Sequence, residues 1–216
     1  MRLFSRIGSL FALWLFHAEW LELSRRLRTI WETQRHLVHP PTTLAQELLI
    51  SGEDHRFFRH GGVDPIAICR AVWRRIAFGR SEGGSTIEMQ VVRVVSGRFE
   101  RTLRRKLCEM ALATLVARAI PKEDLPELYL RIGYFGWRMN GFAEACHRLG
   151  VAADSLTPAD TARLVARLKY PQPRIAGQER WSRINIRAQH LLWLHSQHKG
   201  SRAYVGLKIA PAYEAI

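Results

Sequence analysis

The sequence of 216 residues is poor in cysteine. Cys69, Cys108 and Cys146 lie far apart and no Cys-x-x-Cys pair occurs, which argues against a zinc site or a disulfide framework. Each cysteine lies in an apolar segment of helical period, so we expect all three to be small buried side chains. Strand-like alternation of convincing length and internal repeats are also missing, which predicts a mainly α fold.

Acidic residues are scarce relative to basic ones. Lys and Arg number 33 and Asp and Glu number 19, which gives a formal net charge of +14. This excess predicts an anionic partner, such as nucleic acid, an anionic membrane surface or a phosphorylated substrate. The arginines are spread over several segments and no groove-reading motif accompanies them, which favours a charged face or cleft over nucleic-acid binding. Apolar residues make up 47% of the chain, enough for a core in one domain.

A long uncharged run is missing as well, although residues 7–23 are mostly apolar. Glu19 and Glu22 interrupt the far end of this run, which falls short of the ~20 residues that a spanning helix needs. Three interpretations stay open: a short membrane anchor, an interfacial helix with tryptophans at the headgroup level, or a core helix. No small-residue cleavage site follows, so we expect no removable signal peptide.

Capping residues and prolines predict a series of helices. Thr42 or Thr43 is expected to cap a helix that delivers Glu53, and Ser85 or Thr86 to cap the helix after the Gly-Gly loop. An Asp-Pro pair at 64–65 and a Thr-Pro pair at 157–158 are typical helix starts. The further ranges expected to be helical are 101–119, 122–130, 141–149, 157–168 and 181–195, with an aromatic turn at 134–137.

Apolar periodicity assigns a face to two of these helices. In the helix after the Asp-Pro pair the apolar residues are Ile66, Ile68, Ala71, Val72 and Ile76. In the helix over 101–119 the side expected to be apolar carries Leu103, Leu107, Met110, Ala111, Ala113, Thr114 and Leu115. The same helix carries a basic cluster with one acid, and the alternative for that cluster is a solvated face with Arg105 paired to Glu109.

The densest group of reactive side chains is residues 52–62, Gly-Glu-Asp-His-Arg-Phe-Phe-Arg-His-Gly-Gly. Glu53 and Asp54 closely follow the apolar run Leu48-Leu49-Ile50, an arrangement typical of a working carboxylate held by a rigid element. A helix C-terminus that runs into a Gly-Gly turn is the alternative. If Glu53 and Glu109 share a cleft with Arg and Lys side chains, the site suits displacement at a sugar carbon with a phosphate leaving group. A simple glycosidase needs two carboxyls but not so many cations.

Four motifs in order then resemble those of the peptidoglycan glycosyltransferases. They are Glu53 to Gly62, Gly83 to Gln90, Arg105-Lys106-Leu107-Cys108-Glu109, and Glu127 to Leu130 followed by Tyr134-Phe135-Gly136. The resemblance covers about residues 40–187. This family includes the monofunctional transglycosylases and the glycosyltransferase domains of class A penicillin-binding proteins.

The resemblance implies roles for particular residues. Glu53 is similar to the general base that activates the acceptor 4-hydroxyl, and Glu109 to the second essential carboxylate. Phe57 and His60 are similar to residues that shape the first motif. The implied substrate-binding set is Asp54, Phe57, His60, Ser85, Thr86, Gln90, Arg93, Arg101, Arg105 and Lys106.

The resemblance also implies a fold and a setting. We expect a mainly α, lysozyme-like domain over 40–195, with a large lobe and a small membrane-facing lobe around a cleft. A membrane-associating segment over 1–39 is expected before it, and a tail over 196–216 after it. The expected place is the cytoplasmic (inner) membrane, with the active domain on its periplasmic face.

The implied reaction is polymerisation of lipid II into glycan strands, with undecaprenyl pyrophosphate as leaving group. The implied partners are lipid II, the growing strand, the anionic membrane surface and penicillin-binding transpeptidases, with no nucleic acid. No tightly bound cofactor and no protein metal site are expected; Mg²⁺ or Mn²⁺ would accompany the substrate pyrophosphate.

Several residues depart from the family pattern. Met89 stands in place of a glutamine, Arg93 in place of a lysine, Arg131 in place of an asparagine and Val151 in place of a lysine. These departures leave a second hypothesis open: a catalytically weak or inactive relative that binds lipid II and acts as a partner of the cell-wall machinery.

Overall fold

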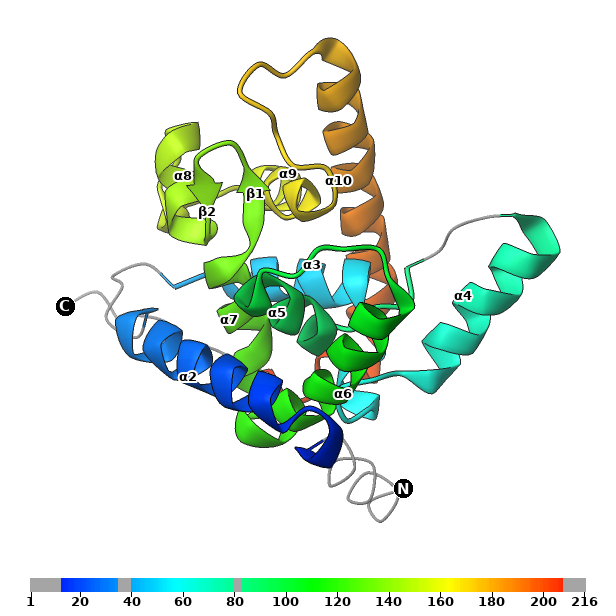
Figure 1. Cartoon of the computed structure of the whole chain (residues 1–216). Helices are drawn as coiled ribbons and strands as arrows, with labels where there is room; N and C mark the ends of the chain where they lie inside the picture. Colours follow the sequence, from blue (N-terminus) through cyan, green and yellow to red (C-terminus); the bar gives the residue numbers. More distant parts are fainter. Residues whose placement is uncertain (1–12, 35–39, 80–82, 208–216) are drawn as a thin grey trace.

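The computed structural model describes residues 13–34, 40–79 and 83–207, and helices dominate it (Figure 1). The helices are α2 (His17–Gln34), α3 (Thr43–Glu53), α4 (Pro65–Phe78), α5 (Ile87–Ser96), α6 (Leu103–Ala119), α7 (Leu125–Ile132), α8 (Phe142–Leu149), α9 (Pro158–Lys169) and α10 (Gln178–His198). Short 3-10 turns lie at Phe57–Arg59, Lys122–Asp124, Ala153–Ser155 and Arg202–Tyr204. The prediction of a mainly α, lysozyme-like fold is confirmed.

The caps that begin these helices were readable in the sequence. Thr42 accepts a hydrogen bond from the backbone of Ala45, and Asp64 accepts one from the backbone of Ile66. Thr86 and Thr157 cap α5 and α9 in the same way. Each such cap stabilises its helix by about 1 kcal/mol, because it satisfies a backbone N–H that has no partner within the helix.

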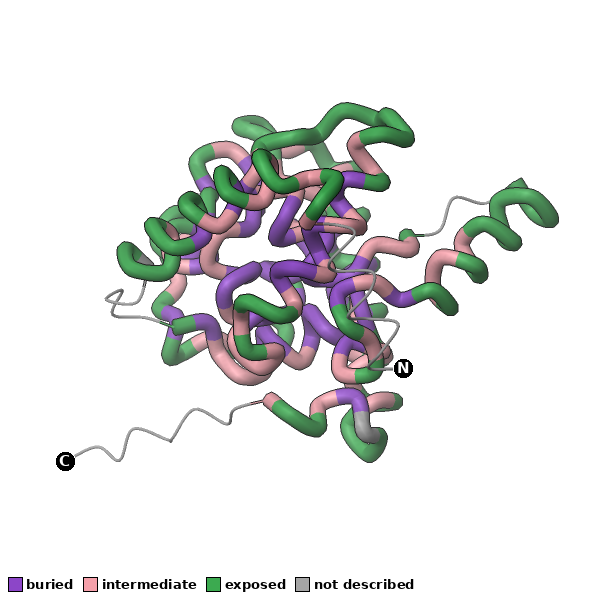
Figure 2. The backbone as a smooth tube through the Cα atoms, turned by 60° about the horizontal axis from the view of Figure 1, so that its bottom comes forward, coloured by how far each residue is buried: buried purple, intermediate pink, exposed green. Residues whose placement is uncertain are grey.

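Helix α3 forms the centre of the core. Its residues Leu48, Leu49 and Ile50 are completely buried, and it packs against α7, α9 and α10. Helix α5 packs against α6 and α7, and α10 packs along α9. Figure 2 shows the buried backbone gathered in the middle of the molecule with exposed segments around it. The last residue of α3, Glu53, is therefore held at the end of a helix that is packed in the core.

Helix α2 continues well past the apolar run at 7–23 and ends at Gln34. Leu23 and Leu27 belong to the core, and α2 packs on α5. The described part of the run is thus a core-packing helix, while residues 7–12 lie outside the described residues. Within the described ranges, no helix is both long and apolar enough to cross a membrane.

Helix α4 differs from the other long helices because none of its residues is buried. Its apolar face is real, but Val72, Trp73 and Ile76 are exposed, Ile76 to 78%. Figures 1 and 2 show α4 extending away from the core. The expectation that all cysteines are buried is therefore wrong for Cys69, which lies on α4, and it is confirmed for Cys108 and Cys146.

The apolar side predicted for α6 is rotated from the observed one. Leu103 is 85% exposed and Leu107 is also exposed. The buried residues of α6 are Cys108, Glu109, Leu112, Ala113, Leu115 and Val116. The predicted apolar side of α6 was wrong because Glu109, a charged residue, faces the core. Apolar periodicity alone places a charged residue on the solvent side.

A short antiparallel hairpin replaces the aromatic turn expected at 134–137. Strand β1 is Tyr134–Gly136 and β2 is Met139–Asn140. Gly136 has φ of 147°, and a Cβ there would collide with the carbonyl of Gln172. The backbone N–H of Trp137 donates to the Gln172 carbonyl at 2.8 Å, which attaches the hairpin to the segment between α9 and α10.

Candidate active site

Glu53 is fixed at the end of α3 by two other helices. Its Oε1 accepts a hydrogen bond from Nη2 of Arg187 on α10 at 2.9 Å, and its Oε2 accepts one from Nε2 of Gln90 on α5 at 3.2 Å. Arg187 Nη2 also donates to the Gly52 carbonyl at 2.7 Å. The Glu53 side chain is 24% exposed and that of Arg187 only 8%, so the carboxylate has limited access to solvent while its partner is buried.

Glu109 is surrounded by three cations. Its Oε1 accepts from Arg93 Nη2 at 2.8 Å and from Lys106 Nζ at 2.9 Å, while Oε2 accepts from Arg93 Nε at 3.0 Å and from Arg105 Nη1. Ser85 Oγ accepts from both Arg93 and Lys106. The alternative of a solvated face with Arg105 paired to Glu109 is right about the pair and about the exposed Arg101 and Arg104, but the Glu109 side chain is only 2% exposed and so is not on a solvated face.

These contacts shift the protonation equilibria of the cluster. Burial alone raises the pKa of the Glu109 carboxyl, but hydrogen bonds from Arg93 and Lys106 and their charges outweigh burial and hold the pKa below its usual range. Burial lowers the pKa of Lys106, and the like charges of Arg93 and Arg105 lower it further. The hydrogen bond to Glu109 and the charge of Glu109 raise it, but they do not outweigh burial. The hydrogen bond to Glu109 raises the pKa of Arg93. Glu109 is therefore an ionised carboxylate that gathers cations.

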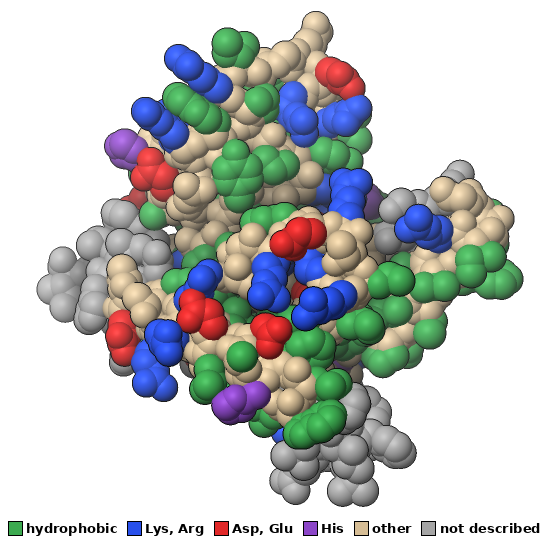
Figure 3. Space-filling view, in the orientation of Figure 1, with side chains coloured by type: hydrophobic (Ala, Val, Ile, Leu, Met, Phe, Trp, Pro, Cys, Tyr) green, Lys and Arg blue, Asp and Glu red, His purple; other side chains and the backbone are tan. Residues whose placement is uncertain are grey.

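One cleft of about 440 Å³ brings four of the predicted residues together. Its lining includes Glu53, Ser85, Gln90 and Arg93. Arg93 also lines a second pocket of about 360 Å³ between α2, α5 and α6, together with Arg105 and Glu109. The Arg93–Glu109 pair thus lies between the cleft and the second pocket. Figure 3 shows acidic and basic side chains gathered in the middle of the face that it presents.

Four of the predicted residues lie beneath the cleft instead of in it. Thr86 is buried, donates from Oγ1 to the Gly62 carbonyl at 2.6 Å and caps α5. Phe57 is completely buried. Asp54 accepts from His60 Nε2 at 3.0 Å and from the backbone N–H of Ile87 at 3.2 Å. These residues join the first motif to the start of α5, and their contact with a substrate stays a prediction.

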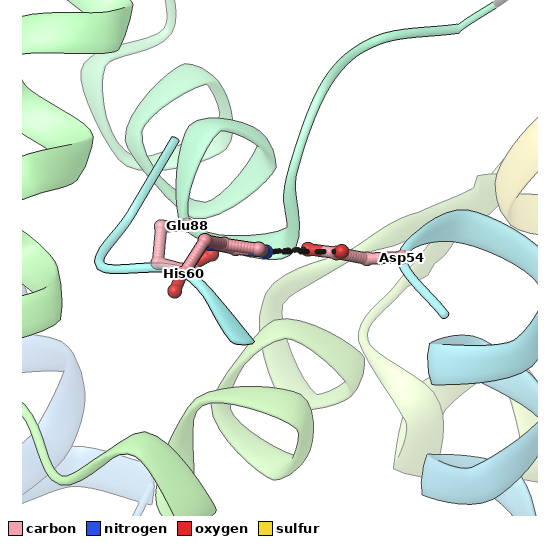
Figure 4. A group of neighbouring side chains, drawn as sticks. All are labelled: Asp54, His60 and Glu88. Carbon is pink, nitrogen blue, oxygen red and sulfur yellow. Dashed lines mark hydrogen bonds and ion pairs between the residues drawn. The ribbon is translucent and has the colours of Figure 1, made fainter. Parts of the chain in front are cut away.

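A buried carboxylate, Glu88, lies close to this pair (Figure 4). One ligand atom from each of Asp54, His60 and Glu88 lies within 4.8 Å of the others, which is close enough for a metal ion. However, His60 pairs with Asp54, and Lys122 pairs with Glu88 and lies over the Phe57 ring at 4.0 Å. Because Lys122 already supplies positive charge, we interpret the group as an ion-pair network that supports the first motif.

The remaining predicted residues and departures lie elsewhere. Arg101 is exposed in the segment before α6, and within the described ranges no hydrogen bond or ion pair joins it to Glu109. Met89 is completely buried, so it belongs to the core, and its neighbour Gln90 faces Glu53. Arg131 pairs with Glu127 on α7 at 2.7 Å. Val151 packs against the core.

Sequence reasoning missed three residues at the site. Arg187 binds Glu53 from 134 residues away, and Tyr129 and Lys169 line the cleft. Burial and then the charge of Glu53 raise the pKa of the Tyr129 hydroxyl. A signal for Arg187 was present: it occupies the core-facing side of α10 together with Ile184, Ala188 and Leu191. A charged residue at such a position needs a buried partner.

The fold and the site together define a helical protein with a cleft that holds one carboxylate beside a cluster of cations. The family described as Transglycosylase matches residues 24–192 of this chain. Penicillin-binding protein 1A of Escherichia coli is 37% identical over 139 residues, which cover 61% of this chain and 16% of that protein. Penicillin-binding protein 1F of Bacillus subtilis is 37% identical over 128 residues, covering 58% of this chain and 18% of that one.

A protein of Cupriavidus necator that is provisionally named a transglycosylase is 36% identical over 124 residues, covering 57% of this chain and 54% of that protein. The chain thus spans between 16% and 54% of the length of these three relatives. It belongs to the peptidoglycan glycosyltransferase family, also called the transglycosylases.

Proposed function

We propose that this protein polymerises lipid II into glycan strands, with Glu53 as the general base and undecaprenyl pyrophosphate as the leaving group. The observation that carries the proposal is the cleft itself, in which Glu53 and Arg93 share one lining and Arg93 leads into the cation cluster on Glu109. A carboxylate beside fixed cations suits attack by a hydroxyl on a carbon that carries a phosphate.

In the proposed step, Glu53 takes the proton of the acceptor 4-hydroxyl as its oxygen attacks the anomeric carbon of the donor. The bond from that oxygen to the carbon forms while the bond from the carbon to the pyrophosphate oxygen breaks on the opposite side, which inverts the configuration. Gln90 and Arg187 hold the carboxylate oxygens, so its orientation is set before the substrate arrives.

The leaving pyrophosphate takes the electron pair of the broken bond, and cations stabilise its charge. Arg93, Arg105 and Lys106 are already gathered by Glu109 and Ser85, so little reorganisation is needed when the charge develops. Because phosphate is a good leaving group when its charge is neutralised, no side chain has to protonate it. Glu109 acts in this proposal as the residue that positions the cations.

We further propose that Mg²⁺ or Mn²⁺, where it takes part, arrives with the pyrophosphate. The carboxylates Glu53 and Glu109 already have cationic partners, so they fit a role beside an ion-bound substrate better than that of preformed metal ligands. The proposed place of work is the outer face of the cytoplasmic membrane, where lipid II, the growing strand and transpeptidases of the penicillin-binding type would meet it.

The decisive experiment incubates purified protein with labelled lipid II and measures the polymer formed. Removing a positioned base typically costs ~10²–10⁴-fold in rate, so Glu53→Gln is expected to keep its fold and lose glycan synthesis. The matched control is Glu144→Gln on the exposed side of α8, which is expected to polymerise at the wild-type rate. Wild-type polymerisation by Glu53→Gln would refute the assignment of the base.

The same assay separates the enzyme from the non-catalytic hypothesis. Binding of lipid II by the wild type without any turnover would show a binding protein of the cell-wall machinery. Two of the positions that differ from the family pattern do not by themselves favour that outcome, because Met89 is buried in the core and Val151 packs against it.

A further inference from the structure

Three arginines from separate segments gather around one tryptophan ring. The guanidinium carbon of Arg148, on α8, lies 4.3 Å from the centroid of the Trp137 ring. Those of Arg138 and Arg174 lie 4.8 Å and 5.3 Å from it. Trp137 and Arg138 form the turn between β1 and β2, and Arg174 precedes α10. We refer to Trp137, Arg138, Arg148 and Arg174 as the Trp137 cluster.

The Trp137 cluster concentrates positive charge without balancing it. All three arginines are exposed, and none forms an ion pair within the described part of the chain. The indole face stabilises each guanidinium, but the three like charges around one ring repel one another. An anion bound between them would relieve that repulsion, and a planar guanidinium presents paired donors that match a carboxylate or phosphate.

The backbone at Arg138 supports a functional interpretation of the cluster. Arg138 has φ of 54°, and among the described residues it is the one non-glycine residue with positive φ. This conformation costs free energy for any side chain with a Cβ, and glycine would adopt it freely. The chain nevertheless places a guanidinium there, directed to the Trp137 ring.

The cluster lies at the end of two segments that line the catalytic cleft. Tyr134 and Pro171 line the cleft beside Glu53. Tyr134 begins β1 and Pro171 lies in the segment after α9. These two segments run parallel to each other and are joined by backbone hydrogen bonds of Gln172 with Phe135 and Trp137. Three residues further along, both segments reach the cluster, at Trp137 and Arg174. Figure 3 shows basic and apolar side chains together on this upper part of the molecule.

We propose that the Trp137 cluster binds the glycan strand next to the cleft, with its arginines on carboxylates of the strand's peptide stems. This inference rests on the proposed function, because it takes the strand to be the polymer in the cleft. A strand with acidic peptide stems offers the chemistry that the cluster can recognise, because its carboxylates match the paired donors of the guanidinium groups.

An anionic bilayer fits the cluster less well than a strand does. The apolar exposed surface suited to lipid is α4, which Figure 1 shows on a different side of the molecule from the hairpin and α8. The Trp137 cluster offers one half-buried ring and no apolar stripe. A discrete ligand with spaced carboxylates therefore matches it better than a flat surface.

The test compares binding of uncross-linked glycan strands with intact peptide stems to binding of the same strands after an amidase has removed the stems. The wild type is expected to bind intact strands at least about tenfold more tightly. Arg138→Gly combined with Arg148→Ala and Arg174→Ala is expected to lose that preference. The matched control removes three exposed arginines elsewhere: Arg28→Ala, Arg118→Ala and Arg183→Ala.

Equal binding of intact and stripped strands by the wild type, or an unchanged preference in the cluster variant, would overturn the inference. Loss of the preference in the control would overturn it too, because net charge and not the cluster would then explain binding. A cluster variant that keeps its preference for intact strands but loses binding to phosphatidylglycerol vesicles would show that the cluster binds the membrane instead.

A lipid II turnover assay on the same proteins keeps the two proposals apart. Cluster-dependent strand binding by a wild type that does not turn over lipid II would refute the proposed function and leave the inference intact. Turnover of lipid II without cluster-dependent strand binding would refute the inference and leave the proposed function intact.

Discussion

Two charged residues at core-facing positions, Glu109 and Arg187, organise the site. Each lies in a helical stripe that is otherwise apolar, and each is almost completely buried. A buried charge is tolerated only with partners, and the partners are residues of the proposed site: Glu109 gathers Arg93, Arg105 and Lys106, and Arg187 holds Glu53. Under the proposed function, stability and activity are therefore expected to depend on the same ion pairs.

Arg187 is expected to act as a positioning residue for Glu53. Arg187→Lys keeps the charge, but an ammonium group does not reproduce the planar guanidinium whose Nη2 donates to both the Gly52 carbonyl and the Glu53 carboxylate. A small displacement of a base costs ~10²-fold, so kcat is expected to fall by about that factor with little change in KM. Arg183→Ala, four residues earlier on the exposed side of α10, is the control. A rise in KM with unchanged kcat would instead place Arg187 on the substrate.

Glu109 predicts an acid-sensitive contribution to stability. Because its pKa in the folded protein is held below the ordinary value of 4.5, the unfolded chain binds its proton first as pH falls. The contribution of Glu109 is thus fully present above about pH 4.5 and is lost as pH decreases through the folded value.

Glu109→Gln tests this linkage. At pH 7 it is expected to be less stable by about 3 kcal/mol, because it leaves buried cations without their counter-charge. Unfolding free energies between pH 3 and pH 7 are expected to fall less steeply for the variant than for the wild type. If the unfolding free energies of the wild type and the variant depend on pH in the same way, Glu109 does not change its protonation on unfolding.

At the scale of elements, α4 is the helix whose amphipathic face has no partner in the described structure. Exposed apolar side chains and the basic residues Arg74 and Arg75 occur together on α4, a combination that fits an interfacial helix. Trp73→Glu with Ile76→Glu is expected to weaken binding to anionic vesicles about tenfold or more, since each buried apolar side chain contributes ~1.5–3 kcal/mol.

The α4 variant is expected to keep its stability within about 0.5 kcal/mol, because neither side chain is buried. Trp193→Glu, at an exposed tryptophan on α10, is the matched control and is expected to bind vesicles as the wild type does. Early melting of the α4 variant would show that α4 packs on the core after all.

At the scale of the whole molecule, the net charge of +14 predicts salt-dependent membrane binding. Each well-placed Lys or Arg contributes about 1 kcal/mol at an anionic surface, and salt screens this attraction. High salt is expected to weaken binding of the full chain to anionic vesicles without abolishing it, because apolar burial persists. Complete release by salt, measured by vesicle co-sedimentation, would contradict an apolar contribution.

A comparison with a shortened chain has to keep α2. Leu23 and Leu27 lie in the core, so removing residues 1–39 would expose part of it. A chain that begins at residue 13 keeps these contacts and isolates the contribution of the first twelve residues. Vesicle binding equal to that of the full chain would show that those residues contribute nothing.

The sequence by itself determined the helices, their capped starts and the motifs that carry Glu53 and the Glu109 cluster. These features are local: a Thr or Asp cap acts on backbone N–H groups two or three residues away, and a motif on one helix fixes its spacing. The order of the motifs then sufficed to predict the family and the two carboxylates.

Only the tertiary structure decided which of those residues meet. Arg187 reaches Glu53 across 134 residues, and α6 turns Glu109 instead of Leu107 toward the core. The Trp137 cluster likewise joins a hairpin turn, α8 and the segment before α10. Local hydrophobicity cannot encode such pairs, because a buried charge is stable only through a partner that the packing of distant helices supplies.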